Sequence, residues 1–232
     1  MKHLHIALWG VLPYLSLVVF VGGNVWRYRY DRFGITTHSS QIHESRILRV
    51  AGPVFHLGLL MVIAGHVVGL IVPESLTERL QVPESVYRAN ALIVGGTAGV
   101  AAALGFAALI WRRLRTRAVR VSSQRSDRLL YPVLAIVLGA GLAATFAGAR
   151  SGSYDYRLGV SIWFRSLFGL DPNVDAMNGA PLVYQVHALI GMALFALWPF
   201  SRLVHAFAAP LGYVVRPYVV YRSRGVRAPS RQ

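Results

Sequence analysis

Four histidines stand inside two long apolar stretches of this 232-residue chain, and their type and spacing point to metal chemistry. His56 and His66 belong to FHLGLLMVIAGHVVG, and His187 and His205 belong to a second stretch, residues 184–207. Polar side chains at membrane depth are costly and usually functional. One such histidine could be a packed residue with a helix–helix hydrogen bond, whereas two pairs on two stretches favour a ligand role.

The spacing of these histidines predicts two separate facing pairs. At 1.5 Å per helical residue, His56 and His66 are about 15 Å apart, and His187 and His205 about 27 Å, or about five turns of one helix face. If the two helices run antiparallel, His56 faces His205 and His66 faces His187. The unequal spacing requires tilt or a kink at Pro199, and the ten-residue step predicts that the two bound groups are tilted differently.

Paired imidazoles that face each other across a gap between helices suit haem iron, with one axial ligand from each helix. A zinc site would gather three or four ligands tightly. The chain has no cysteine, which excludes thiolate zinc sites and iron–sulfur ligation by this chain. A proton relay of histidines would lack an intramembrane carboxylate partner. The other histidines are expected at the surface: His3, His5, His38 and His43.

Small and cationic residues near the four histidines are compatible with a bound macrocycle. Glycines beside the histidines could make room for it or serve ordinary helix packing: Gly65, Gly69 and Gly191. Arginines at the helix ends could pair with haem propionates or simply mark membrane topology: Arg112, Arg113 and Arg202.

Five apolar segments must position these residues. The chain is 55% hydrophobic and 14% charged, whereas soluble domains carry about 25% charged residues. Each segment is near the ~20 residues that an α-helix needs to cross a ~30 Å hydrocarbon core, where every backbone group needs an internal partner. We therefore predict an all-α integral membrane fold, a single membrane domain over residues 1–232. The spans are residues 6–26, 50–72, 89–111, 129–147 and 181–207.

Charge predicts the orientation of these spans. The net charge is +15, from 24 basic and 9 acidic residues. Arginines cluster between apolar runs, which follows the positive-inside rule rather than the pattern of a nucleic-acid binder. The N-terminus is then outside and the C-terminus cytoplasmic, with an uncleaved first span. The basic tail, residues 208–232, is either a lipid-facing anchor or a docking surface for a cytoplasmic partner.

Local features refine the helices. Pro13 in the first span requires a neighbour that satisfies the carbonyl it leaves free. Ser126 and Asp127 are plausible caps of the fourth span. The long outer loop contains YRLGVSIWFRSLFGL, which we expect to form an interfacial helix with Trp163 and Phe164 among the lipid headgroups. Small residues in the third span predict close helix packing: Gly95, Gly99 and Gly105.

Several stretches carry a resemblance to a known family: FHLGLLMVIAGHVVG, GGTAGV, WRRL, PFSRLVH and LPYLSLVVFVGGNVWRYRYD. Over nearly its whole length, the chain resembles the gamma subunit of membrane-bound respiratory nitrate reductase. The resemblance implies a dihaem cytochrome b in the cell membrane of a bacterium or archaeon. Such a subunit oxidises menaquinol or ubiquinol near an outer haem b. It passes electrons through an inner haem b to cytoplasmic partners, the iron–sulfur beta subunit and the molybdenum alpha subunit.

The same resemblance implies roles for individual residues. His66 and His187 would hold the outer haem, and His56 and His205 the inner one. Nitrate would be reduced to nitrite on the alpha subunit, so this chain would be a subunit of a quinol-dependent nitrate reductase without the nitrate site itself.

The quinol contacts depart from the family pattern. The family has a lysine before the third span, but VPESVYRANALIVGG has none. Tyr87 falls at or beside that position with Arg88 next to it, so either could bond a quinone oxygen, beside Gly65 and His66. Arg88 could equally be an interfacial anchor.

Two alternatives remain open at this point. One is a cytochrome b subunit of another quinone-linked complex, of the hydrogenase or formate dehydrogenase type. The other is a haem-free transporter with pore-lining histidines.

Overall fold

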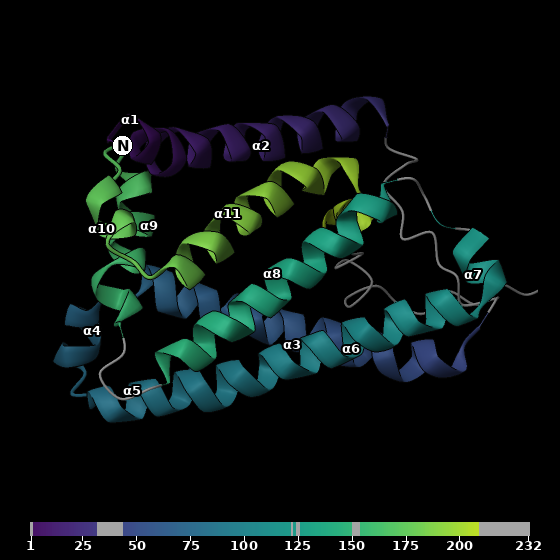
Figure 1. Cartoon of the computed structure of the whole chain (residues 1–232), viewed down its shortest axis with the longest axis horizontal. Helices are drawn as coiled ribbons and strands as arrows, with labels where there is room; N and C mark the ends of the chain where they lie inside the picture. The colour runs from purple at the N-terminus through teal and green to yellow at the C-terminus, as the bar shows by residue number, and fades with distance from the viewer. Residues whose placement is uncertain (1, 32–43, 122, 124–125, 150–153, 209–232) are drawn as a thin grey trace, which may run out of the picture.

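The computed structural model describes residues 2–31, 44–121, 123, 126–149 and 154–208, and within these ranges the chain is helical with connecting turns (Figure 1). Five helical stretches are long and apolar enough to cross a membrane, which confirms the predicted all-α fold with five such helices. They are Lys2–Tyr30, Arg46–Ile71, Glu84–Arg115, Asp127–Gly148 and Leu182–Phe200.

Two of the long stretches contain π-helical turns, and the last one is completed by 3-10 turns. The long elements are α1 (Lys2–His5), η1 (Ile6–Val11) and α2 (Leu12–Tyr30); α3 (Arg46–Ile71); α5 (Glu84–Asn90), η3 (Ala91–Gly95) and α6 (Gly96–Arg115); α8 (Asp127–Gly148); and α11 (Leu182–Leu197), η5 (Trp198–Phe200) and η6 (Arg202–Ala208). The connecting elements are α4 (Glu74–Arg79), α7 (Arg117–Val121), η4 (Tyr156–Leu158), α9 (Val160–Phe168) and α10 (Val174–Asn178).

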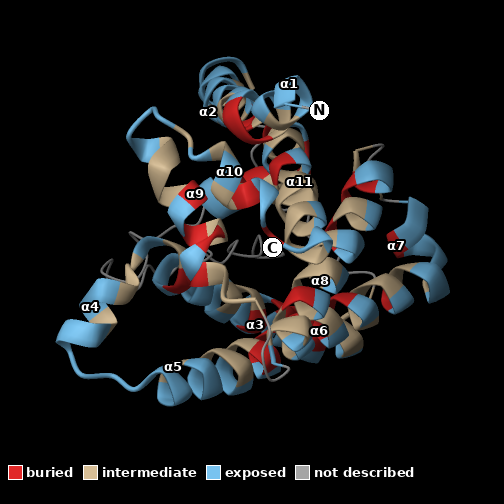
Figure 2. Ribbon diagram, turned by 60° about the vertical axis from the view of Figure 1, so that its left-hand side comes forward, coloured by how far each residue is buried: buried red, intermediate tan, exposed pale blue. Residues whose placement is uncertain are grey.

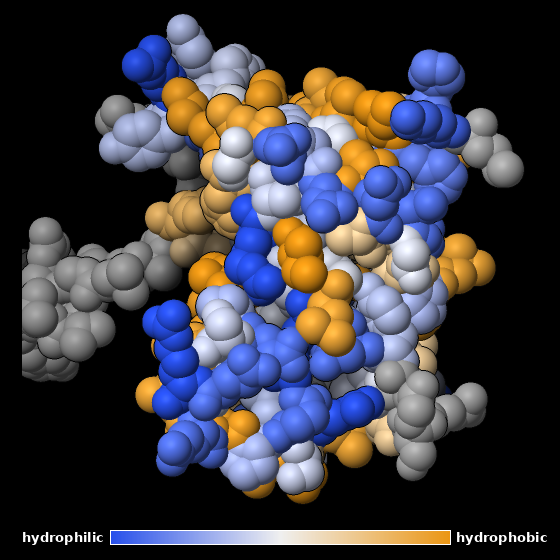
Figure 3. All heavy atoms as spheres, turned by 90° about the vertical axis from the view of Figure 1, so that its left-hand side faces the viewer, coloured by the Kyte–Doolittle hydropathy of each residue, from blue (hydrophilic) through white to orange (hydrophobic). Residues whose placement is uncertain are grey.

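The long helices pack in a sequence that leaves α3 and α11 apart. α3 packs along α6, α6 along α8, α8 along α11, and α11 along α2, whereas no comparable packing joins α3 to α11 (Figure 1). We call the end where α2 and α6 finish and α3 and α8 begin the arginine-rich end. The opposite end, with α4, α5, α9 and α10, is called the acidic end. Figure 3 faces the acidic end and shows hydrophilic side chains gathered across it.

Glycines set the close approach of α3 and α6. A Cβ on Gly58 would lie 2.6 Å from the Ala102 amide nitrogen, and one on Gly105 would lie 2.6 Å from the Phe55 amide nitrogen. Backbones this close have no room for a side chain, which is the small-residue packing expected in lipid. Gly99 packs in the same way against Leu142 of α8, whereas a Cβ on Gly95 would meet nothing within 4 Å.

Helix α9 docks on carbonyl groups that prolines leave without a donor. Pro13 has no N–H to donate to the Trp9 carbonyl four residues earlier. The Trp163 indole donates to that oxygen at 2.8 Å, and the two tryptophan rings meet edge to face. The expectation that a neighbour satisfies this carbonyl is confirmed.

A second hydrogen bond to a carbonyl freed by proline joins α9 to α3. Pro73 cannot donate to the Gly69 carbonyl, and the Ser161 hydroxyl donates to it at 2.8 Å. Ser161 is fully buried and Trp163 nearly so. Figure 2 shows buried residues at α9 and α10. The predicted short helix is present as α9, but the expected place of Trp163 among the lipid headgroups is wrong, because its side chain is buried within the protein. These donors are needed inside the protein, where an unpaired carbonyl is costly.

The last span departs from the predicted helix over residues 181–207. α11 ends at Leu197, a 3-10 turn follows at Pro199, and Ser201 is extended. His205 then lies on a separate 3-10 element, η6, so the expected single helix face for His187 and His205 is wrong. Proline cannot continue the α-helical hydrogen bonds, which is the physical reason for the break.

Two smaller expectations also change. The Ser126 side chain makes no capping bond at the start of α8. Asp127, the first residue of α8, is buried in ion pairs instead. The tail from residue 209 onward lies outside the described residues, so its predicted role is not addressed by the structure.

Candidate functional site

The four histidines form two pairs across the space between α3 and the last span. The ring centroids of His56 and His205 are 6.2 Å apart, with the ring planes at 73°. Those of His66 and His187 are 5.9 Å apart, at 36°. These are the pairs that an antiparallel arrangement predicts, one toward the arginine-rich end and one toward the acidic end. Their role as metal ligands stays a prediction.

The ring separations fit a metal held between two imidazoles. A metal–nitrogen bond of about 2 Å and an imidazole radius of roughly 1 Å place two trans rings about 6 Å apart, centre to centre. Direct hydrogen bonding between imidazoles would require nitrogen atoms about 3 Å apart, hence closer rings. The observed separations, 6.2 and 5.9 Å, match the metal-bridged arrangement.

Three of the four imidazoles have a defined tautomer. Nδ1 of His56 lies 2.8 Å from the Gly52 carbonyl, and Nδ1 of His66 lies 2.8 Å from the Val62 carbonyl. Nδ1 of His205 lies 2.5 Å from the carbonyl of Arg202. A carbonyl oxygen only accepts, so each Nδ1 donates its proton and a neutral ring keeps the Nε2 lone pair for a metal.

His187 is held differently. Its Nδ1 is buried and has no hydrogen bond among the described residues, although the backbone of Val137 lies close enough to interact with the ring. A Cβ on Gly141 would lie 3.0 Å from the His187 Cε1 atom, so this glycine lets the imidazole rest against α8. Helix α8 therefore supports His187 from outside its own helix.

His56 and His66 are exposed on α3 and make no helix–helix hydrogen bond, so the alternative of packed core histidines is wrong for them. A Cβ on Gly65 or on Gly191 would meet nothing within 4 Å. Gly69 differs, because the Tyr156 hydroxyl lies 3.0 Å from its Cβ position.

The three arginines proposed for propionates are paired with carboxylates of the chain. Arg112 donates from Nε to the Glu44 carboxylate at 2.6 Å, and it also donates to the Glu44 carbonyl at 2.5 Å. Glu44 in turn accepts from the Ile47 amide at 2.9 Å, which ties the start of α3 to the end of α6. This amide bond leads the effects that hold the pKa of Glu44 below its usual value.

Arg113 and Arg202 share Asp127, and we call these three residues the Asp127 cluster. The Asp127 carboxylate is 1% exposed and accepts two bonds of 2.7 Å from Arg202, from Nε and from a terminal nitrogen. Arg113 donates to it at 2.8 Å, and it also donates to the Tyr131 hydroxyl and lies over that ring. One carboxylate thus joins α6, α8 and the segment after α11.

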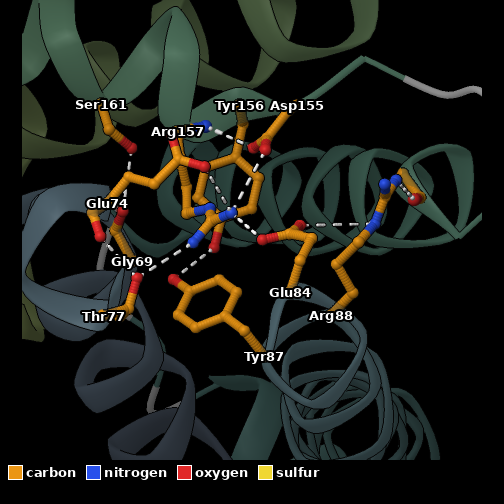
Figure 4. Close-up of polar contacts among 11 residues, drawn as sticks. Gly69, Glu74, Thr77, Glu84, Tyr87, Arg88, Asp155, Tyr156, Arg157 and Ser161 are labelled. Atoms are coloured by element: carbon orange, nitrogen blue, oxygen red, sulfur yellow. Dashed lines mark hydrogen bonds and ion pairs between the residues drawn. The ribbon is translucent and has the colours of Figure 1, made fainter. Parts of the chain in front are cut away.

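The acidic end carries the reverse arrangement, which we call the Arg157 cluster (Figure 4). The Arg157 guanidinium is 3% exposed and pairs with Glu84, with Glu74 at 3.3 Å and with Asp155 at 3.4 Å. Burial disfavours its charge, but the Asp155 bond and the neighbouring carboxylates outweigh burial, so the pKa of Arg157 is raised. The three carboxylates lie close enough to suggest a metal site, but Arg157 already occupies their centre.

The predicted quinol residues adjoin the Arg157 cluster. The Tyr87 ring lies under the Arg157 guanidinium, 4.3 Å from its carbon, and the Tyr87 hydroxyl is 3.0 Å from that of Tyr156. Burial and this bond raise the pKa of Tyr156, which keeps the phenol protonated. Arg88 points away from this pair and donates to the Gly148 carbonyl at 3.3 Å.

Sequence reasoning missed Tyr156, Arg157 and the ion pairs that Asp127 makes with two arginines. A signal existed for Asp127, which is an acid within an arginine run and so has the opposite sign to its surroundings. Of the other histidines, His3 is exposed as expected, but the Nδ1 of His5 is buried. His38 and His43 lie outside the described residues.

Fold and site together define a class, a protein of five helices long and apolar enough to cross a membrane, with two facing histidine pairs between them. The family described as nitrate reductase gamma subunit matches residues 5–224. The nitrate reductase gamma chain of Bacillus subtilis (strain 168) is 42% identical over 217 residues, covering 94% of this chain and 97% of that one. The chain therefore belongs to the nitrate reductase gamma subunit family.

Two further relatives are also similar to this chain over nearly its whole length. The respiratory nitrate reductase 2 gamma chain of Escherichia coli (strain K12) is 30% identical over 224 residues, covering 96% of this chain and 99% of that one. The nitrate reductase-like protein NarX of Mycobacterium tuberculosis (strain ATCC 25618 / H37Rv) is 50% identical over 218 residues. That match covers 93% of this chain but 33% of NarX, so this chain spans about a third of the length of that relative.

Proposed function

We propose that this chain is the dihaem cytochrome b subunit of a quinol-dependent respiratory nitrate reductase in a cell membrane. It oxidises quinol at the outer side and delivers electrons to an iron–sulfur beta subunit and a molybdenum alpha subunit, which reduces nitrate to nitrite. The observation that carries the proposal is the pair of imidazole couples at metal-bridging separation, 6.2 and 5.9 Å between ring centres. Family membership favours nitrate reductase over a hydrogenase or formate dehydrogenase complex.

The ligand residues fit haem b at both pairs. His56 and His205 would hold the inner haem, and His66 and His187 the outer one. When bound, the two haems supply one-electron carriers that connect the two membrane faces. The chain fixes the tautomers of His56, His66 and His205 through backbone carbonyls, which leaves Nε2 of each ring available to a metal.

The cationic groups fit the propionates of the inner haem unequally. Arg113 and Arg202 share a single carboxylate, so these three groups carry a formal charge of +1 that another carboxylate can balance. Arg112 faces Glu44, which already matches its charge. We therefore assign propionate pairing to Arg113 and Arg202 before Arg112.

Orientation follows from charge. The arginine-rich end faces the cytoplasm and the N-terminus lies outside, because cytoplasmic segments of membrane proteins carry the excess of arginine. The beta and alpha subunits then dock at the arginine-rich end, next to the inner pair.

The quinol site lies beside the outer pair, with Gly65, His66, Tyr87 and Arg88 around it. Oxidation of a quinol releases its hydroxyl protons together with two electrons. The Tyr87 hydroxyl is hydrogen-bonded to that of Tyr156, so this couple can accept a hydrogen bond from a quinol hydroxyl while both phenols stay protonated. Arg88 is 42% exposed and provides the positive charge that the missing lysine would supply.

A reduced-minus-oxidised spectrum of the purified full chain, with the ratio of haem to protein, tests the proposal. We expect b-type bands and two haems per chain. A colourless protein would favour the transporter alternative. His66→Ala and His187→Ala should each remove the outer haem and quinol oxidation while the inner haem stays; loss of the inner haem alone in either variant contradicts the pairing.

A further inference from the structure

Of the four histidines, His205 has the least regular α-helix around it. The helix that precedes it ends at Leu197, and Pro199 and the extended Ser201 separate α11 from η6. His56 and His66 lie in the middle of one α-helix, where both flanking turns fix their direction. The direction of the His205 ring must therefore come from contacts outside a regular helix.

One such contact comes from the residue that opens η6. The Arg202 carbonyl accepts from the His205 Nδ1 at 2.5 Å. The side chain of the same Arg202 is held through two nitrogens, Nε and a terminal nitrogen, by the two oxygens of Asp127. A two-point bond of this kind fixes the plane as well as the position of a guanidinium. Asp127, Arg202 and His205 thus form a chain of contacts from α8 to the imidazole.

Asp127 is itself fixed. It is 1% exposed, and Arg113 of α6 also donates to its Oδ2 atom. The carboxylate therefore cannot turn to solvent when Arg202 moves. Val204 is 2% exposed and also anchors η6, by apolar packing.

We propose that Asp127 is a positioning residue for the inner haem: through Arg202 it orients the carbonyl that orients His205 toward His56. The inference rests on the proposed function, because it concerns the ring that would bind the inner haem. Ligand orientation by outer partners is a general feature of metal sites, and losing such a partner typically costs 10–100-fold in metal affinity.

The test compares two acid-to-amide variants at the same end of the full chain, purified in detergent. Asp127→Asn removes the two-point bond to Arg202. Glu44→Gln removes the negative charge from an equally short arginine pair, which joins the residues before α3 to α6 and does not reach His205. Haem content is measured first. The low-spin ferric signals in electron paramagnetic resonance, which report the orientation of the axial imidazoles, are measured next.

We expect Asp127→Asn to lower the inner-haem content or shift its signal, with the outer signal retained, and Glu44→Gln to change neither. An unchanged inner signal in Asp127→Asn, or equal changes in both variants, overturns the inference. If Asp127→Asn yields no folded protein, Arg202→Lys decides, since lysine keeps the charge but cannot make the two-point bond. An unaltered inner signal there also overturns it. A wild-type chain without two haems would instead contradict the proposed function.

Discussion

Each end of the molecule buries one charged group among partners of the opposite charge, and the sign of the buried group differs between the two ends. At the arginine-rich end, the buried Asp127 carboxylate holds two guanidiniums, whereas at the acidic end the buried Arg157 guanidinium holds three carboxylates. The formal charge of the first cluster is +1 and that of the second is −2. In each, the central group is almost fully buried and its partners are more exposed.

The exposure of the partner side chains indicates which cluster should be destabilised more when its central residue is removed. A buried charge that loses its partner is costly because nearby water cannot replace the interaction. The partners of Asp127 are 15% and 24% exposed, whereas the three partners of Arg157 are 22%, 32% and 46% exposed. Loss of the centre should therefore cost more at the arginine-rich end, where the abandoned charges have less access to water.

The largest effect is expected for Asp127→Ala. It leaves two guanidiniums facing each other in a poorly solvated site, so the free energy of unfolding should fall by about 3–5 kcal/mol. Chemical unfolding of the detergent-solubilised chain, followed by circular dichroism, measures it. A loss below that of Arg157→Ala would reverse the comparison between the two ends.

Arg157→Ala should cost less, roughly 2–3 kcal/mol, between the values for buried and exposed ion pairs. The three carboxylates can take up water or protons once the guanidinium is gone. We therefore expect the variant to recover part of its stability on mild acidification, measured by unfolding at several pH values. Recovery at high pH instead would contradict this account.

Tyr156→Phe should cost about 0.5–1.5 kcal/mol, the value of one hydrogen bond, because it removes the bond to Tyr87. It should also slow quinol oxidation without changing haem content. Tyr14→Phe is the matched control: it loses the hydrogen bond to the Leu167 carbonyl at the same end, so similar stability with unimpaired quinol kinetics is expected. Equal kinetics in both variants would remove Tyr156 from the quinol site.

The smallest expected effect is a loss of folding stability at acidic pH, caused by protonation of Glu44. The Ile47 amide, ahead of Arg112, holds the pKa of this carboxyl below its ordinary value of 4.5. A depressed pKa in the folded state gives stability that is present above the unfolded-state value and is lost as pH falls through the folded-state value. Wild type should lose this contribution below about pH 4.5, and Glu44→Gln should lack that part of the pH dependence. An identical acid profile in both proteins would contradict the assignment.

Much of the site could be predicted from local sequence because its determinants are local. The period of the helix and the length of the apolar runs indicate five spans, and His56, His66, His187 and His205 meet in the expected pairs. The His56–His205 pair nevertheless differs from the prediction in its backbone, because His205 lies on a 3-10 element beyond Pro199 and not on the same helix as His187. Where a proline-broken segment turns next depends on the surfaces it meets, which a repeating pattern does not contain.

Sequence by itself determined the helices, the excess of arginine at one end and the histidines that a metal would need, because these follow from hydropathy, charge and spacing along the chain. Tertiary structure alone decided which carbonyls freed by Pro13 and Pro73 take donors from α9, and which charges Asp127 and Arg157 gather. Most of those partners lie more than 70 residues away in sequence, although Arg113 is 14 residues from Asp127 and Asp155 is two from Arg157. They are selected because a polar group buried away from water must find a partner wherever the packed helices bring one.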